Sequence, residues 1–259
     1  MIDYRVCLTT KVNPKTLQQS SSSKSIIVIE IEDYEPSEIQ EIRRKGYRVL
    51  GYLSLGTNEK SRSWYEFYSK YNLSRLEDWP DEYYVDVRRS EWRGHLVSVA
   101  KQYKAMGVDG FWLDNLDVYE YHKSTSMYNS CVLALERIKK EVGGYIMVNG
   151  GSEFFDKFMD KDTKHKGLPS VDGVTQEEVY SLIKNYDKKD ENSGKKGIFG
   201  EQKSNMHRWY QSYMKRLRRH LFDTFLLEYT RSDSLKKRID NFCTKYKMTG
   251  RCVSDDVDL

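Results

Sequence analysis

The sequence lacks the features that would place it among membrane or exported proteins. No apolar run approaches the roughly 18 residues needed to cross a bilayer, so we expect a soluble protein with no membrane insertion. The first ten residues, MIDYRVCLTT, lack the apolar stretch of a signal peptide. This indicates a cytoplasmic protein or a chain whose export signal has been removed.

Cysteine and histidine are sparse, and their spacing does not match that of metal ligands. The four cysteines form no CxxC pair, so we expect buried free thiols, with a Cys243–Cys252 disulfide as an open alternative. The five histidines are scattered without metal-ligand spacing. The sequence therefore argues against a zinc site.

Phosphate-binding glycine-rich loops and nucleic-acid-binding motifs are absent as well. The pair Gly150–Gly151 follows an asparagine and has no such motif around it. The net charge of +4 is small, and the densest basic run, residues 215–220, has the pattern of a solvated helix face. We therefore expect no nucleic-acid partner.

What the chain has is enough length and aromatic content for one sizeable folded domain. It contains 259 residues with 20 Tyr and 5 Trp, which is too aromatic for a disordered chain. A polar protein with many aromatic side chains is typical of those that bind flat, hydroxylated ligands such as sugars.

Strand-like apolar runs alternate with helical patterns along most of the chain. Helices are predicted at residues 36–46, 90–106, 128–142, 204–221 and 232–246. This alternation predicts a single-domain (β/α)8 TIM barrel over residues 25–259, after an N-terminal strand and polar linker at residues 1–24. Residues 185–203 are predicted to be a mobile loop over the site. The barrel strands are expected at 26–31, 47–55, 83–87, within 108–119, and at 145–148, 171–176, 224–229 and 250–254, and the additional strand at 4–8 could shift this count by one.

Two segments repeat the same short pattern and end in carboxylates. VDGFWLDNLDVY begins at Val108, VDGVTQEEVY begins at Val171, and each is a predicted strand. Asp114 and Glu177 stand at the same step after the shared aspartate, so they should project at matching heights from alternate barrel strands. Two carboxylates facing one cleft suit glycoside hydrolysis, where one donates a proton and the other attacks the sugar or activates water.

Other polar residues follow the predicted strands at the end where barrel active sites lie. Together they predict an acidic rim, and aromatic residues in the nearby loops could stack on sugar rings. The rim residues are Glu30, Glu32, Glu59, Asp117, Asn149, Glu178, Glu228, Tyr229 and Asp255, and the aromatic residues are Trp64, Tyr65, Tyr68, Trp79, Tyr83, Trp112, Tyr119, Tyr121 and Tyr180.

These motifs occur together in one known family. From about residue 26 to 259, the chain resembles the endo-α-1,4-polygalactosaminidases, glycoside hydrolase family 114. The motifs are YLSLGTNEKSRSW, VDGFWLDNLD, VNGG, VDGVTQEEVY, LLEY and CVSDDVDL, in that order. The resemblance implies a TIM barrel without metal or organic cofactor that cleaves internal α-1,4 linkages of a galactosamine-containing polysaccharide, as in microbial exopolysaccharides. It also implies a monomer that acts outside the cell or at its surface.

The resemblance also assigns roles by position. Asp114 matches the family's strand-four aspartate and Glu177 its strand-six glutamate, which we interpret as nucleophile and general acid/base of a retaining mechanism. Glu178 is the rival of Glu177, but a regular strand would point it to the opposite side. Substrate-binding roles are expected for Glu59, Arg62, Trp64, Trp112, Asp117, Asn149, Glu228, Tyr229 and Asp255.

Two alternatives remain open from the sequence. The barrel could bind polysaccharide with little or no catalysis, because Thr57 stands where some relatives have an acidic residue. The acidic rim could instead support a metal-dependent reaction. The distance between the carboxyl groups is informative, because about 5–5.5 Å fits a retaining pair and about 6.5–9.5 Å an inverting pair.

Overall fold

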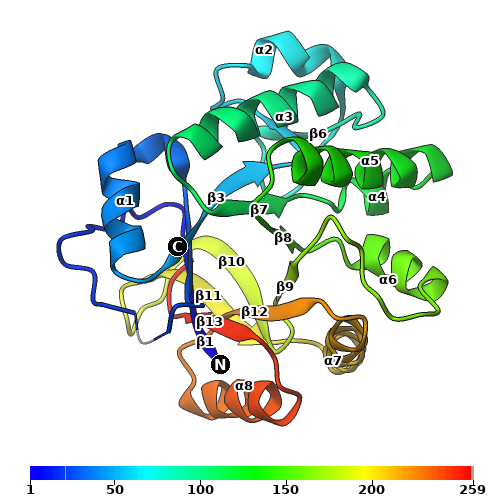
Figure 1. Cartoon of the computed structure of the whole chain (residues 1–259). Helices are drawn as coiled ribbons and strands as arrows, with labels where there is room; N and C mark the ends of the chain where they lie inside the picture. Colours follow the sequence, from blue (N-terminus) through cyan, green and yellow to red (C-terminus); the bar gives the residue numbers. More distant parts are fainter. Residues whose placement is uncertain (21, 258–259) are drawn as a thin grey trace.

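Eight parallel strands close into a barrel in the computed structural model, which describes residues 1–20 and 22–257. Helices surround the strands on the outside (Figure 1). The predicted single-domain (β/α)8 TIM barrel is therefore confirmed. Around the barrel the strands are β1 (Ile2–Cys7), β13 (Gly250–Ser254), β12 (Asp223–Tyr229), β9 (Gly173–Glu177), β8 (Tyr145–Asn149), β7 (Gly110–Asp114), β3 (Arg48–Ser54) and β2 (Ile26–Ile29).

Two of the main helices begin at capping serines. Ser124 accepts a hydrogen bond from the backbone N–H of Met127, and Ser232 accepts one from Leu235, as N-cap serines do. The main helices are α1 (Pro36–Arg44), α3 (Ser90–Ala105), α5 (Thr125–Glu141), α6 (Ser152–Lys161), α7 (Ser204–Arg219) and α8 (Asp233–Lys245). Shorter turns are η1 (Ile31–Asp33), α2 (Tyr65–Tyr68), η2 (Ser69–Tyr71) and α4 (Val118–Tyr121).

One of the expected barrel strands is replaced by another. Strand β1 pairs in parallel with β13 and β2, so the N-terminal strand belongs to the barrel, which begins at Ile2 and not at residue 25. The segment predicted at residues 83–87 forms β6 (Glu82–Val85) instead, outside the barrel. Strand β6 pairs antiparallel with β4 (Thr57–Glu59) and β5 (Asn72–Arg75) in a separate three-stranded sheet, whereas neighbouring barrel strands pair in parallel.

The prediction of a mobile loop at residues 185–203 is wrong, because most of this segment is an antiparallel hairpin. Strands β10 (Ser181–Lys189) and β11 (Lys196–Glu201) pair with each other and form a separate two-stranded sheet. Arg231 secures the hairpin, since its guanidinium donates to the carbonyl oxygens of Gly197 and Lys196 at 2.8 Å each. The many lysines of these exposed or half-buried strands conceal their structure in the sequence.

Alternating residues of each barrel strand divide the core into two layers. The interior of the barrel is filled by a cluster that includes Tyr4, Val28, Leu50, Trp112 and Phe225. The neighbouring residues of the same strands face outward and pack against the helices, as Ile27, Ile29, Val49, Phe111 and Leu226 do.

The repeated Val-Asp-Gly motif has the same structural role in both copies. Asp109 accepts a hydrogen bond from the backbone N–H of Val49 at 2.9 Å, and Asp172 accepts one from Ile146 at 2.7 Å. Each aspartate thus fixes the start of the neighbouring strand. Because β7 and β9 both run five residues from this point, they end in Asp114 and Glu177, as the repeat predicted.

All four cysteines are free thiols, so the Cys243–Cys252 disulfide does not form. Among the residues that the structure describes, no helix has the length and apolar character needed to cross a membrane. Residue 21 of the predicted linker and residues 258–259 of the predicted barrel domain lie outside this described part.

Candidate active site

A cavity of about 810 Å³ opens at the carboxyl ends of the barrel strands. Its floor contains Asp114 of β7, Asn149 of β8, Glu177 of β9 and Tyr229 of β12. Its walls include residues of the β4–β6–β5 sheet and of the β10–β11 hairpin. This is the face on which TIM barrels have their active sites.

Asn149 holds the two predicted catalytic carboxylates together. Its side-chain Nδ2 donates to Asp114 Oδ1 at 3.0 Å and to Glu177 Oε1 at 2.7 Å. Because Nδ2 contacts both oxygens, the distance between Asp114 Oδ1 and Glu177 Oε1 cannot exceed the sum of the two hydrogen-bond lengths, about 5.7 Å. The second oxygen of Glu177 accepts a hydrogen bond from the Tyr229 hydroxyl at 2.8 Å.

Burial and mutual repulsion raise the pKa values of these carboxyl groups. Burial, followed by the charge of Glu177, raises the pKa of Asp114 to about 7. Burial also raises the pKa of Glu177, while the hydrogen bonds from Asn149 and Tyr229 oppose this change. Ionising both groups at neutral pH is therefore unfavourable, and a pair that keeps one proton meets the requirement for an acid and a base in one site.

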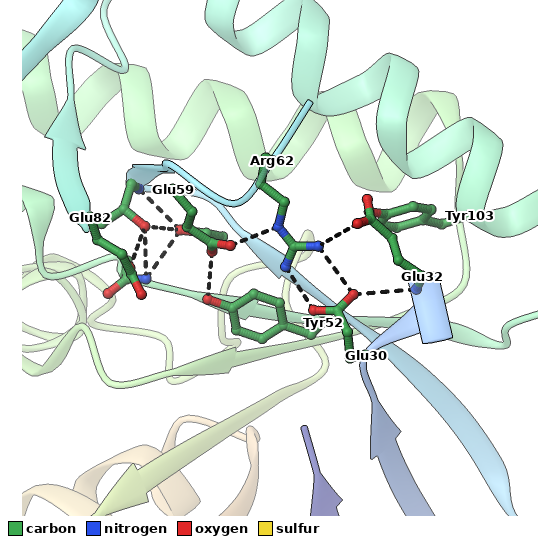
Figure 2. Close-up of polar contacts among 10 residues, drawn as sticks. Glu30, Glu32, Tyr52, Glu59, Arg62, Glu82 and Tyr103 are labelled. Atoms are coloured by element: carbon green, nitrogen blue, oxygen red, sulfur yellow. Dashed lines mark hydrogen bonds and ion pairs between the residues drawn. The ribbon is translucent and has the colours of Figure 1, made fainter. Parts of the chain in front are cut away.

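Arg62 is the centre of a second polar cluster at the edge of the cavity. Figure 2 shows its guanidinium between Glu59 on one side and Glu30 on the other. Arg62 Nε donates to Glu59 at 2.7 Å and Nη2 to Glu30 at 2.7 Å, and Nη1 lies 3.2 Å from Glu32. Glu59 also accepts a 2.9 Å hydrogen bond from the Tyr52 hydroxyl. These contacts fix Glu59 and neutralise its charge.

Sequence reasoning missed Glu82, a carboxylate that lines the same cavity. It comes from β6, directly opposite Glu59 of β4. Its Oε2 accepts a 3.0 Å hydrogen bond from the Thr57 hydroxyl. Burial, followed by the charge of Glu59, raises the pKa of Glu82 to about 7. No motif marks this residue, and only its place opposite Glu59 in a sheet unforeseen from the sequence could have revealed it.

Aromatic side chains form part of the walls and the mouth of the cavity. Trp112 is buried and lies in the floor. Trp79, from the β5–β6 connection, contacts Tyr186 of the hairpin with ring centroids 5.5 Å apart. Tyr84 and Tyr121 stack at 4.9 Å. Such rings offer apolar faces to the C–H surfaces of sugars.

Glu228, a predicted substrate-binding residue, does not line the cavity. It is fully buried, and its Oε2 accepts hydrogen bonds from the backbone N–H of Ser181 at 2.9 Å and from the Ser181 hydroxyl at 2.7 Å. The backbone N–H of Tyr180 also donates to it at 3.1 Å. Glu228 therefore attaches the start of the hairpin to β12 and is not available to a sugar.

Two further predicted substrate-binding residues also lie away from the cavity lining. Trp64 packs against the His95 ring with centroids 4.8 Å apart. Asp255 forms an ion pair with Lys195 at 2.6 Å. The structure does not bring these residues to the candidate site.

Glu178 does line the cavity, although the sequence predicted that it points away from Glu177. Strand β9 ends at Glu177, and Glu178 has a left-handed backbone with φ of 55°, so the regular alternation stops there. The Glu178 carboxylate accepts a hydrogen bond from the backbone N–H of Ile183. Its main contact is thus with the hairpin.

The cavity lining is strongly acidic. Only Arg62 and Arg75 carry positive charge among the described lining residues, and Arg62 is already paired. Nowhere in the described part of the chain is a group of three or more His, Cys, Asp or Glu side chains arranged to hold a metal ion. The lining carboxylates are Glu30, Glu59, Glu77, Asp78, Glu82, Asp114, Asp117, Glu120, Glu177 and Glu178.

Two buried acceptors in the cavity lining have no hydrogen-bond partner. Asn149 and Gln176 are each 6% exposed, and Asn149 Oδ1 and Gln176 Oε1 are unpaired. Buried acceptors are nearly always paired, because leaving one without a donor costs free energy. Each of these two oxygen atoms exposes less than 1 Å², so neither is open to a ligand in this arrangement.

Comparison with known proteins places the chain in a family. The family profile of Glycoside-hydrolase family GH114 matches residues 4–150, more than half of the chain. An uncharacterized protein of Thermotoga maritima is 27% identical over 121 residues, which cover 42% of this chain and 38% of that protein. The uncharacterized protein MJ1477 of Methanocaldococcus jannaschii is 25% identical over 160 residues, which cover 57% and 46%. The matches thus span less than half the length of these curated relatives.

Solved glycoside hydrolases share the fold at low sequence identity. The glycoside hydrolase domain of PelA from Pseudomonas aeruginosa has a TM-score of 0.76 at 16% identity, with 99% of this chain and 96% of that chain covered. Aspergillus fumigatus Ega3, in complex with galactosamine, has a TM-score of 0.68 at 14% identity, with 100% and 92% covered. The motifs, the barrel and the profile match agree, and the chain belongs to glycoside hydrolase family GH114.

Proposed function

We propose that this protein is a glycoside hydrolase that cleaves internal α-1,4 linkages of a galactosamine-containing polysaccharide. The observation that supports this most directly is the Asn149 amide, which hydrogen-bonds to both Asp114 and Glu177 in the floor of an open cavity. Family membership supports the reaction class. The galactosamine bound to Ega3, a protein of the same fold, supports the sugar.

In the proposed first step, Asp114 is the nucleophile and Glu177 the general acid. The Asp114 carboxylate attacks the anomeric carbon while Glu177 gives its proton to the leaving glycosidic oxygen, so one C–O bond forms as another breaks. The longer side chain suits Glu177 to reach the leaving oxygen. The hydrogen bonds from Tyr229 and Asn149 stabilise the Glu177 carboxylate that results.

In the second step, water displaces the Asp114 carboxylate from the anomeric carbon. Glu177, now ionised, takes a proton from this water as the water attacks, and the Asp114 carboxylate leaves. The bound that Asn149 sets on the separation of the two oxygens, about 5.7 Å, matches the about 5–5.5 Å typical of retaining enzymes better than the wider inverting range. We therefore propose retention of the anomeric configuration.

The cavity supports a cationic, hydroxyl-rich substrate. Its carboxylates make the local potential negative although the net charge of the chain is +4, because nearby charges dominate the field in a cleft. Asn149 also lines this cavity, with its amide between Asp114 and Glu177. We propose that Glu59, Arg62, Trp112, Asp117 and Tyr229 also orient the sugar. Because such polymers lie outside cells, we further propose an extracellular or cell-surface site of action.

The test is fragment release from a partly deacetylated α-1,4-galactosamine polymer. We expect the native protein to release short oligosaccharides of mixed length, which indicates internal cleavage, and the Glu177→Gln variant to release none. Glu178→Gln is the matched control, because it changes the neighbouring carboxylate, and it should keep more than a tenth of the activity. Binding of the intact polymer without fragments would instead identify a binding protein.

A further inference from the structure

Glu82 lines the cavity, and one of its carboxylate oxygens has no hydrogen-bond partner among the described residues. Its Oε2 accepts the hydrogen bond from Thr57, while no described residue pairs with Oε1. The side chain is half-buried and comes from β6, on the wall formed by the small antiparallel sheet. Figure 2 shows it on the far side of Glu59 from the Arg62 guanidinium.

Hydroxyl groups behind Glu82 are oriented to donate toward it. Asn115 Nδ2 donates to Ser54 Oγ and to Thr57 Oγ1 at 3.1 Å each. The Thr57 hydroxyl gives its single proton to Glu82, so the 2.6 Å contact between Ser54 and Thr57 must use the proton of Ser54. The hydrogen bond from Thr57 thus opposes the rise in the Glu82 pKa that burial and Glu59 cause.

Among the residues that the structure describes, Glu82 has no ion-pair partner. Glu59 stands directly opposite it across the β4–β6 pair, and like charges in that position destabilise a sheet. Arg62 compensates Glu59 at 2.7 Å, but no lysine or arginine forms an ion pair with Glu82 among the described residues. A cationic ligand would gain binding free energy at such a half-buried carboxylate, because no cation of the described residues compensates its charge.

Glu82 also lies on the side of the cavity where Asp114 is found. Ser54 and Asp114 are partners in the β3–β7 register, and Asn115 follows Asp114 directly. Asn115 contacts Thr57, and Thr57 contacts Glu82, so a short chain of hydrogen bonds connects the strand end with the wall. A sugar unit seated at Asp114 would therefore have Glu82 beside it.

We propose that Glu82 binds the protonated amine of the sugar unit seated beside Asp114, so that the enzyme selects an unacetylated amino sugar at this position. An ammonium group supplies both the charge and the donor that Oε1 lacks. An N-acetyl group is neutral and larger, and it would leave the carboxylate uncompensated. The acidic lining of the cavity independently favours a cationic ligand.

The test compares the binding of two oligosaccharides. The proposal for Glu82 rests on the proposed function only for the choice of sugar. Fully deacetylated and fully N-acetylated α-1,4-galactosamine oligosaccharides are titrated by calorimetry at pH 7 into Glu177→Gln protein, which keeps the oligosaccharides intact. We expect at least tenfold tighter binding of the deacetylated form. Adding Glu82→Gln should weaken that binding about 10- to 100-fold, the effect of a lost hydrogen bond to a charged group, and change binding of the N-acetylated form less than threefold.

Controls separate recognition by Glu82 from general charge effects. Glu77→Gln removes an exposed carboxylate from the same cavity lining and should leave the preference for the deacetylated form unchanged. Glu82→Asp keeps the charge and should keep most of the preference if Glu82→Gln proves unstable on heating. Equal weakening of both oligosaccharides by Glu82→Gln, no weakening, or no binding at all would overturn the proposal. Amine-selective binding by a protein that releases no fragments would reject the hydrolase function alone.

Discussion

The spacing of the two candidate catalytic carboxylates depends on a single amide group. Asn149 Nδ2 contacts Asp114 and Glu177 at 3.0 and 2.7 Å, and its position at the end of β8 places it between the ends of β7 and β9. Because an amide does not titrate, it can hold both carboxyl groups in any protonation state. The amide oxygen of the same side chain is buried and has no partner among the described residues.

Tyr229→Phe should move the alkaline limb of the pH–activity profile. The variant loses the phenol that donates to Glu177 at 2.8 Å, and this hydrogen bond opposes the rise of the Glu177 pKa. Without it the pKa should rise further, so a general acid stays protonated to higher pH and the alkaline limb shifts upward. Rates measured from pH 4 to 9 test this, and a shift of the acidic limb alone would mean that Glu177 is the nucleophile.

Asp114→Asn should abolish hydrolysis and stabilise the fold at alkaline pH. The pKa of Asp114 is raised from 3.8 to about 7 by burial and by Glu177, so the native state loses stability as pH rises through about 7. Asparagine has no such cost. We expect the variant to be more stable than the parent by about 1–3 kcal/mol at pH 8, with the difference shrinking toward pH 4. Urea denaturation at the two pH values measures this, and an equal difference at both would contradict it.

For single residues, the sequence shows which side chains stand at the strand ends but not which contacts they make. Asp114 and Glu177 were predictable, because the repeated motif sets both their height and their phase. Glu228 also stands near the end of a predicted strand, yet its carboxylate accepts hydrogen bonds from the backbone of the hairpin. That contact joins residues 47 positions apart, and nothing near Glu228 in the sequence indicates it.

Between elements, Arg62 connects segments that are far apart in the sequence. It joins Glu59 of β4 to Glu30, which precedes η1, so the small antiparallel sheet is tied to the end of β2. The Arg62 and Glu59 side chains are each 10% exposed, so solvent screens their ion pair little. The cluster is therefore a structural support for one wall of the cavity.

Arg62→Met should destabilise the protein strongly, because it leaves the buried Glu59 and the half-buried Glu30 without a counterion. Removing one partner of a buried ion pair typically costs about 3–5 kcal/mol. Arg75→Met is the control, since Arg75 lines the same cavity but is exposed, and it should cost less than about 1 kcal/mol. Chemical denaturation of both variants decides the matter, and similar losses of stability would refute this role of Arg62.

The elements themselves were largely predictable, and the exceptions have physical causes. The helices at 36–44, 90–105 and 204–219 begin at the residues that their caps and periodicity indicated. Strand β6 precedes a helix, as a barrel strand would, so its antiparallel pairing with β4 could not be recognised locally. The hairpin lacks the alternating apolar pattern of a strand because most of its residues are exposed or half-buried.

For the whole molecule, the barrel is closed by the N-terminal strand. Strand β1 pairs with β13 at the other end of the chain and with β2, and Tyr4 and Val6 contribute to the interior cluster. The Tyr4 hydroxyl also accepts a 2.9 Å hydrogen bond from Trp112 in the cavity floor. The first strand thus supports the site as well as the fold.

Deletion of residues 1–24 should therefore prevent formation of a folded barrel. The deletion exposes the edges of β2 and β13 and removes buried side chains from the interior. We expect loss of cooperative thermal unfolding, measured by circular dichroism, and aggregation in gel filtration. A deletion variant that unfolds cooperatively as a monomer would show that residues 1–24 are a dispensable segment and that the barrel closes without them.

The anomeric configuration of the first product tests the central claim most directly. Proton NMR during hydrolysis of a deacetylated α-1,4-galactosamine oligosaccharide shows which anomer forms before mutarotation. Asn149 keeps one oxygen of Asp114 and one oxygen of Glu177 within about 5.7 Å, less than the about 6.5–9.5 Å of inverting pairs, so we predict that the α-anomer forms first. Initial formation of the β-anomer would contradict the account of Asp114 as a nucleophile and require an inverting mechanism.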